Sequence, residues 1–162
     1  MRTRFVACVL SLVATTAVSA LAEPLDPSLL VGSWKLTKVY DQFSDGRRRE
    51  TWGSAPQGIL QFTANGIMSV QLSGGERPAH PGTVPTDPVG PYNAYFGTYT
   101  VDAAGRFFEA HVQRSSWPQW NGATLKRTIE ELSSTTLKVV SAPINDPNGG
   151  VFEPHLEFER IK

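Results

Sequence analysis

Two residues combine a chemically useful side chain with a place in a regular pattern: Arg127 and His111. Arg127 lies two residues from both Leu125 and Ile129, so on an extended strand these three side chains share one face. If that face is buried, the guanidinium needs an anion, because an unpaired buried charge is costly. The anion is then a carboxylate, enolate or phenolate of a bound ligand, or a carboxylate of the protein itself. The remaining alternative is a strand face that points into solvent.

His111 is the candidate for proton transfer, because histidine titrates near neutral pH. In the surrounding strand, apolar residues occupy both alternating sets of positions, so the sheet face on which His111 lies stays open. The alternatives are a general base in a cavity, a hydrogen-bonded structural histidine and a surface histidine. If the protein is an enzyme, we expect His111 to act as the base, with Arg127 or Tyr99 stabilising developing oxyanion charge.

Aromatic side chains are the other candidates for a binding surface. Tyr95 and Tyr99 share one strand face with Gly97 between them, which either leaves room for a ligand or forms aromatic core. Trp117 and Trp120 flank a proline in a turn, where they either rim the mouth of a cavity or pack as a corner. The residues expected to bind a ligand are therefore Arg127, His111, Tyr95, Tyr99 and Trp120.

The sequence contains no established catalytic or metal-binding motif. The histidines are scattered, and no H-x-H, H-E-x-x-H, G-x-S-x-G, P-loop or dinucleotide fingerprint occurs. We therefore expect no metal and no cofactor. His155 alternates with glutamates, which predicts a solvated strand face. The basic run at 47–49 follows an Asp-Gly turn and is expected to be an exposed loop.

Composition indicates one globular domain. The 162 residues include four Trp, four Tyr and eight Phe, which is ample apolar surface to bury and argues against disorder. The 15 basic residues are balanced by 15 acidic ones, so a nucleic-acid partner is disfavoured.

The N-terminal segment is typical of a secretory signal peptide. Arg2 and Arg4 precede an apolar run, and small residues lead to Ala20-Leu21-Ala22, an A-x-A cleavage site. We expect cleavage after Ala22, giving a signal peptide at 1–22, a mature domain at 23–162 and a secreted or periplasmic location. The only cysteine, Cys8, is lost with the signal, so the mature chain is expected to lack disulfides. After cleavage of the signal we also expect no integral membrane segment.

Short apolar runs separated by turn residues predict an all-β chain. In the first strand Trp34, Leu36 and Tyr40 are expected on one face. Roughly eight strands joined by tight turns favour an up-and-down antiparallel barrel over a sandwich. The proline-rich segment 73–91 and the segment 142–150 are expected to be loops. The expected strands span 33–43, 49–52, 58–63, 67–73, 94–101, 106–114, 124–132, 136–141 and 152–161.

A wider pattern of residues resembles the bacterial and fungal lipocalin-like domain family, a group of small calycin-type barrels. It runs through Leu30–Leu36, Gly58–Ser69, Tyr95–Val101, His111-Val112, Trp117–Gly122 and Arg127. The resemblance covers about residues 29 to 161 and implies an eight-stranded antiparallel barrel. It implies architecture and says little about activity, because fold does not determine function.

Gly32-Ser33-Trp34 looks like the G-x-W signature of lipocalins. In that family the tryptophan closes one end of the barrel, and an arginine from the last strand often stacks on its indole. By this resemblance Gly32, Trp34 and Arg160 are the barrel-closing residues.

Two functions from different classes follow. The first is an exported, non-catalytic binding protein for a small apolar or aromatic ligand, including anionic ones, which would enter past the loop at 73–91. The second is a cofactor-free isomerase, cyclase or dehydratase that acts inside the barrel. A filled barrel with a structural or partner-binding role is a third alternative.

Overall fold

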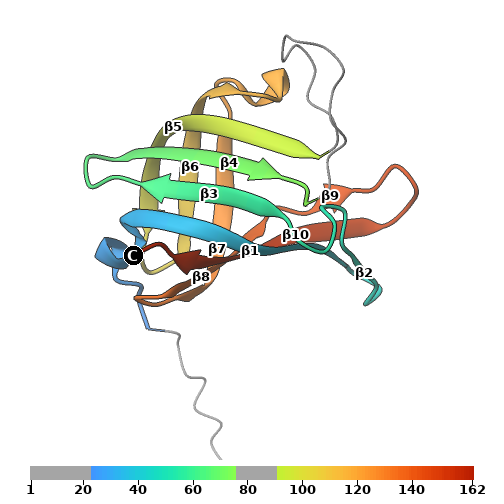
Figure 1. Ribbon diagram of the computed structural model, residues 1–162, viewed down its shortest axis with the longest axis horizontal. Coiled ribbons are helices and arrows are strands. Elements are labelled where there is room, and N and C mark those ends of the chain that lie inside the picture. Colours follow the sequence, from blue (N-terminus) through green and yellow to red (C-terminus); the bar gives the residue numbers. More distant parts are fainter. Residues whose placement is uncertain (1–22, 76–90) are drawn as a thin grey trace, which may run out of the picture.

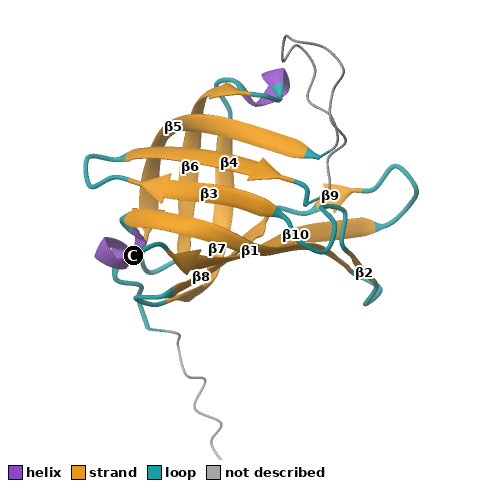
Figure 2. Cartoon of the chain, viewed as in Figure 1, coloured by secondary structure: helices purple, strands orange, loops and turns teal. Residues whose placement is uncertain are grey.

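The computed structural model describes residues 23–75 and 91–162, so the expected signal peptide and most of the proline-rich loop lie outside the described residues. Two one-turn helices, η1 (Pro27–Leu30) and η2 (Pro118–Trp120), accompany the sheet (Figure 2). Within the described ranges no helix is long and apolar enough to cross a membrane. The strands are β1 (Gly32–Phe43), β2 (Arg48–Arg49), β3 (Gln57–Phe62), β4 (Ile67–Ser73), β5 (Tyr92–Asp102), β6 (Phe107–Ser115), β7 (Thr124–Leu132), β8 (Thr136–Ser141), β9 (Ile144–Asn145) and β10 (Val151–Arg160).

Eight of these strands form a closed antiparallel barrel in the order β1-β3-β4-β5-β6-β7-β8-β10, and β10 pairs back with β1 (Figure 1). The short strands β2 and β9 pair outside the barrel with β1 and β10. This architecture confirms the prediction of an all-β, up-and-down barrel and excludes the sandwich. Closure leaves the eight-stranded barrel without an unpaired edge. It suits strands joined by short turns, because such turns connect antiparallel neighbours and cannot make the crossover connections that parallel strands need.

The sequence pattern places the turns well because the turn residues have a physical role. Between β3 and β4, Gly66 adopts φ +83°, and the Thr63 and Ile67 backbones bond across the turn at 2.9 Å. Asn-Gly sequences tolerate this left-handed geometry, which is why the hairpin could be predicted.

The first strand contains a bulge that the sequence pattern does not reveal. The β1–β10 register shifts between Leu36 and Lys38. Before this bulge the inward side chains are Trp34 and Leu36, and after it they are Val39 and every second residue that follows. The expectation that Tyr40 shares the face of Trp34 is therefore wrong. One extra residue reverses the parity of everything that follows it.

Large side chains fill one end of the barrel. Trp34, Phe62, Phe108 and Phe158 are almost completely buried, and the Phe62 ring meets Phe108 edge-on at 5.1 Å. The core is therefore solid at the end where η1 lies. The short elements β2, β9 and η2 lie toward the opposite end (Figure 1). A cavity opens at that end.

Candidate ligand-binding site

The barrel encloses a cavity of about 560 Å³ toward this open end. Its volume falls in the range of sites that hold small organic ligands. Inward positions of all eight barrel strands supply the wall, because alternate residues of each strand point to the axis. Aliphatic and aromatic members of the wall include Val39, Leu60, Val70, Leu72, Tyr95, Phe108, Trp120, Leu125, Val139 and Leu156.

Two of the predicted ligand-binding aromatics meet in this wall. Tyr95 of β5 is buried and contacts Trp120 of η2 edge-on, with ring centroids 5.8 Å apart. Trp117 stacks on Trp120 at 5.9 Å and is half exposed at the rim of the cavity. The turn after β6 thus brings indole surface over the mouth.

Arg127 lies in the cavity wall on β7. Its Cα partners across the sheet are Phe108 and Ser141, which also line the cavity, so the strand face is inward. Nη1 donates a hydrogen bond to the carbonyl oxygen of Lys126 at 2.9 Å. No carboxylate among residues 23–75 and 91–162 lies within ion-pair distance of the guanidinium. The strand face of Arg127 therefore does not point into solvent, and no carboxylate of the described residues pairs with it. These were two of the alternatives that the sequence left open.

A second polar group lies at the mouth and was not foreseen. Asp41 of β1 is buried, and its Oδ2 accepts hydrogen bonds from Arg49 Nε at 3.1 Å, Arg49 Nη2 at 3.0 Å and Thr51 Oγ1 at 2.7 Å. Arg49 Nη1 also pairs with buried Asp146, which lies beyond β9. The expectation that the whole basic run is an exposed loop is wrong for Arg49, because two carboxylates hold it at the cavity.

These contacts shift the pKa values of Asp146 and Arg49. The backbone N–H of Asn148 and then the Arg49 guanidinium lower the pKa of Asp146 below its ordinary value. Hydrogen bonds to Asp146 and Asp41 raise the pKa of Arg49. Both shifts favour the ionised forms of Asp146 and Arg49, and the one arginine is shared between two carboxylates.

The structure does not bring His111 and Tyr99 into the cavity wall. His111 lies on the outer face of β6, with Nδ1 3.1 Å from Thr124 Oγ1 and Nε2 3.4 Å from Thr100 Oγ1. Tyr99 points inward but lies at the filled end, where its hydroxyl donates to the Thr63 carbonyl oxygen at 2.9 Å. Burial raises the pKa of the Tyr99 phenol.

The filled end is sealed by Trp34, Arg160 and Gly32. The Arg160 guanidinium carbon lies 4.1 Å from the centroid of the Trp34 ring, and Trp34 Nε1 donates to the Leu30 carbonyl oxygen at 2.8 Å. Gly32 adopts φ +138°, and a Cβ there would collide with Arg160 Nη1. The glycine is needed because the guanidinium occupies the space of its missing side chain.

The family model of the lipocalin-like domain matches residues 31–161, which is nearly the whole described barrel. The chain belongs to the lipocalin-like domain family. This result confirms the resemblance seen in the sequence, and the closed barrel of Figure 1 agrees with it.

Solved structures that are similar to this chain include the following two. A redesigned β barrel is 16% identical, covering 83% of this chain and 94% of that chain, with a TM-score of 0.41. EF1p2_mFAP2b bound to DFHBI is 15% identical, covering 83% and 96%, also with a TM-score of 0.41. No curated protein matches the chain.

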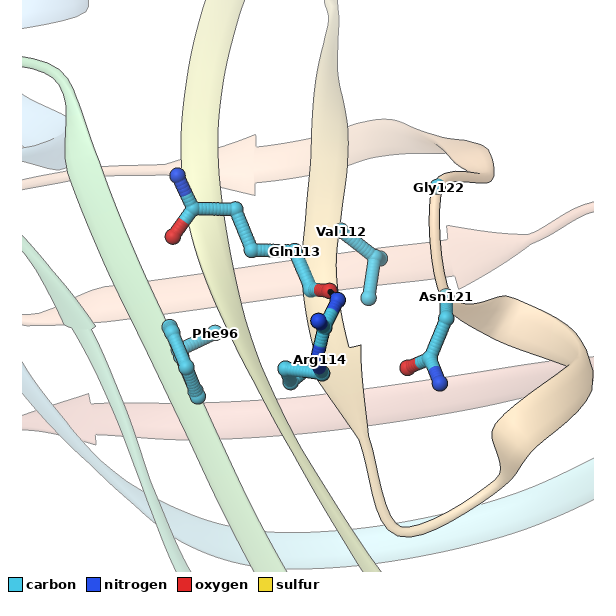
Figure 3. Close-up of a pocket in the computed structure, with 6 residues that line it drawn as sticks. All are labelled: Phe96, Val112, Gln113, Arg114, Asn121 and Gly122. Carbon is cyan, nitrogen blue, oxygen red and sulfur yellow. Dashed lines mark hydrogen bonds between the residues drawn. The ribbon is translucent and has the colours of Figure 1, made fainter.

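A second hollow lies on the outside of the lipocalin-like barrel (Figure 3). It is lined by residues of β5, β6 and the turn between η2 and β7: Phe96, Val112, Gln113, Arg114, Asn121 and Gly122. All of them except Val112 are exposed, so this is a surface depression and not the interior. Among the described residues no group of three or more His, Cys, Asp or Glu could hold a metal ion.

Proposed function

We propose that the protein is an exported binding protein whose cup takes a small apolar or aromatic ligand bearing an anionic group. The lipocalin-like barrel supplies a ligand-binding cup in general terms. The observation that carries the proposal for the ligand is Arg127, a cation in the wall of an aromatic cavity with no carboxylate beside it among the described residues. Export is supported by the basic, apolar and A-x-A pattern of residues 1–22.

An arginine in such a wall favours an anionic ligand for an energetic reason. A guanidinium loses hydration when a ligand displaces water from the cavity, and only an opposite charge with good geometry compensates for that loss. Charge-assisted hydrogen bonds to a carboxylate are about twice as strong as neutral ones and are often bidentate. The aromatic wall would then bury the body of the ligand.

The enzyme alternative is not favoured by this geometry. His111, its proposed base, lies on the outer face against two threonines. The Tyr99 hydroxyl is occupied by the Thr63 carbonyl at the filled end. Neither group can reach a molecule held beside Arg127 without rearrangement of the barrel.

The test compares a matched pair of ligands, 2-naphthoate and neutral 2-naphthamide, by isothermal titration calorimetry. We expect Arg127→Leu to weaken 2-naphthoate about 10- to 100-fold, because a hydrogen bond to a charged group contributes about 1.5–3 kcal/mol. The affinity for 2-naphthamide should change much less.

Arg114→Leu is the matched control. Arg114 lies exposed on β6, and its Nη1 also donates to the carbonyl of the preceding residue, at 2.8 Å, but it does not line the cavity. This variant should bind both ligands like the wild type. Equal weakening of both ligands by Arg127→Leu, or no binding of either by the wild type, would overturn the proposal.

A further inference from the structure

We propose that the cavity recognises a two-ended ligand, with its anionic group on Arg127 and a hydrogen-bond donor, an O–H or an ammonium, on Asp41 across the cavity. This inference rests on the proposed function and adds the second recognition group. It assigns Asp41 as a residue that determines ligand specificity.

The strand register places these two residues in one row of the barrel. Asp41 pairs with Pro154, and Arg127 pairs with Ser141. Because His155 pairs with Val140 in the antiparallel β8–β10 ladder, Pro154 and Ser141 are the next positions opposite each other. The row therefore crosses β1, β10, β8 and β7, and all four of its members line the cavity.

This row brings Asp41 and Arg127 to opposite walls. Three strand spacings separate them, which is about 14 Å along the wall at about 4.8 Å per spacing. In a barrel of eight strands, three spacings are nearly half of the circumference, and Figure 1 shows β1 on the near side with β7 behind it. Both side chains point to the axis, and the two do not form an ion pair with each other. The space between them is the cavity.

Asp41 has an acceptor to offer. All three of its hydrogen bonds from Arg49 and Thr51 end on Oδ2, and Oδ1 accepts none from the described residues. The three bonds also fix the carboxylate, so that little conformational freedom is lost when a ligand binds. Asp41 therefore presents a held acceptor to the cavity, with Oδ1 as the atom available to a donor.

The charges on the two walls are complementary to such a ligand. Arg49 is shared between Asp41 and Asp146, so this cluster holds one more negative than positive charge. Arg127 on the other wall is a positive charge without a carboxylate among the described residues. An aromatic acid with a donor at its far end would satisfy both walls, and an ammonium donor would also balance the charge.

The experiment measures Kd of the wild type for four rigid acids that differ only at the far end. They are 2-naphthoate, 6-hydroxy-2-naphthoate, 6-methoxy-2-naphthoate and 6-(aminomethyl)-2-naphthoate. We expect the hydroxy and aminomethyl acids to bind about tenfold more tightly than 2-naphthoate, because each gives Asp41 a donor. The methoxy acid, which has similar shape but no donor, should gain nothing.

Two variants assign the preference to Asp41. In Asp41→Asn the affinity for the aminomethyl acid relative to that for 2-naphthoate should fall about tenfold. Asp45→Asn is the control, since Asp45 lies exposed on the β1–β2 turn and pairs with Arg47. Should Asp41→Asn fail to fold, carbon-13 NMR of the wild-type Asp41 carboxyl replaces it. The signal should shift with the hydroxy acid and stay in place with the methoxy acid.

The outcomes separate this inference from the proposed function. If all four acids bind the wild type equally, but weakly to Arg127→Leu, the cup still takes anions and the role of Asp41 is wrong. If the advantage of the aminomethyl acid over 2-naphthoate survives Asp41→Asn, another group provides it and the assignment is overturned. If none of the acids binds, both proposals fail together.

Discussion

At the scale of single residues, Arg160 is the side chain on which closure of the filled end depends. Besides covering Trp34, it donates from Nε to the Ser134 carbonyl at 2.7 Å, from Nη1 to the Val31 carbonyl at 2.8 Å, and from Nη2 to the Leu29 carbonyl. Arg160→Leu removes these donors and leaves carbonyl groups without partners. We expect a loss of about 2–4 kcal/mol in the free energy of unfolding.

Urea unfolding followed by tryptophan fluorescence measures this loss. Arg160→Lys should recover little, because a lysine cannot supply the planar, many-donor contact. Arg114→Leu, at an exposed position of β6, should stay within about 0.5 kcal/mol of the wild type. A similar stability for Arg160→Leu and the wild type would contradict a closing role.

Residue types alone could predict part of the candidate site. Arg127 was a good candidate because a cation between Leu125 and Ile129 stands out on an apolar face. Asp41 was missed because the bulge after Leu36 reverses the alternation, which hides that Asp41 shares the inward face with Val39. Its partner Arg49 looked like one of three solvated arginines, and only the β1–β2 pairing brings the two together. Bulges depend on tertiary context, so the pattern of one strand does not predict them.

At the scale of elements, the β5–β6 ladder depends on Gly97. The register shifts there, leaving Gln113 as the extra residue of β6, and a Cβ on Gly97 would collide with the His111 carbonyl oxygen and lie 3.0 Å from Gln113 N. The missing side chain of Gly97 therefore lets the backbone of β6 approach closely. The expectation that the glycine leaves room for a ligand is not needed to explain its presence. The bulge lies just before the turn that carries Trp120 over the cavity.

Gly97→Ala should cost about 2–3 kcal/mol of unfolding free energy, because neighbouring backbone cannot move aside as a flexible side chain can. Gly122→Ala is the comparison: its φ is +79° and nothing lies within 4 Å, so only left-handed strain of about 1 kcal/mol applies. Thermal or urea unfolding of the two variants measures both costs. Equal costs would show that the close approach at Gly97 is relieved without penalty.

The contact between β9 and the barrel should depend on pH through Asp146. Its folded pKa lies below the ordinary 3.8, so the ionised carboxylate contributes stability that is fully present above about pH 4. That contribution is lost as the pH falls through the lowered folded value. The amide hydrogen-exchange protection factors of residues 144–150, which correct for the intrinsic rate at each pH, should be lower at pH 3 than at pH 6.

Asp146→Asn isolates this effect from other carboxylates, since Asp26 and Asp45 also have lowered pKa values. The variant should exchange faster than the wild type at pH 6, and the difference between the two proteins should be smaller at pH 3. A constant difference between the two proteins across this pH range would contradict the sign of the linkage.

At the scale of the whole molecule, the sequence predicted the barrel because each tight turn forces neighbouring strands to be antiparallel. The bounds of β4, β7 and β8 agree with the expected 67–73, 124–132 and 136–141. The strand expected at 49–52 is instead the short β2, and β9 falls in a segment expected to be a loop. Each of these strands is only two residues long, which is too short to give an alternating pattern, and each pairs with the end of a barrel strand close to it in sequence. Because both lie at the mouth, the details of the site were harder to predict than the fold.

The proposed signal peptide predicts that the protein is processed during export. The residues just after the expected cleavage site are attached to the barrel: the Glu23 carbonyl accepts from Arg106 at 2.8 Å, and Leu25 N donates to the Ala103 carbonyl at 3.0 Å. Cleavage after Ala22 would therefore spare these contacts.

Expressed in a bacterial host with an export pathway, the chain should yield a product beginning at Glu23, found outside the cytoplasm and identified by intact mass. Ala20→Gln with Ala22→Gln should block processing, because the cleaving enzyme needs small residues there. The mature protein made directly from Glu23 should unfold at the same temperature as the processed one, and a product of full length in the exported fraction would refute cleavage.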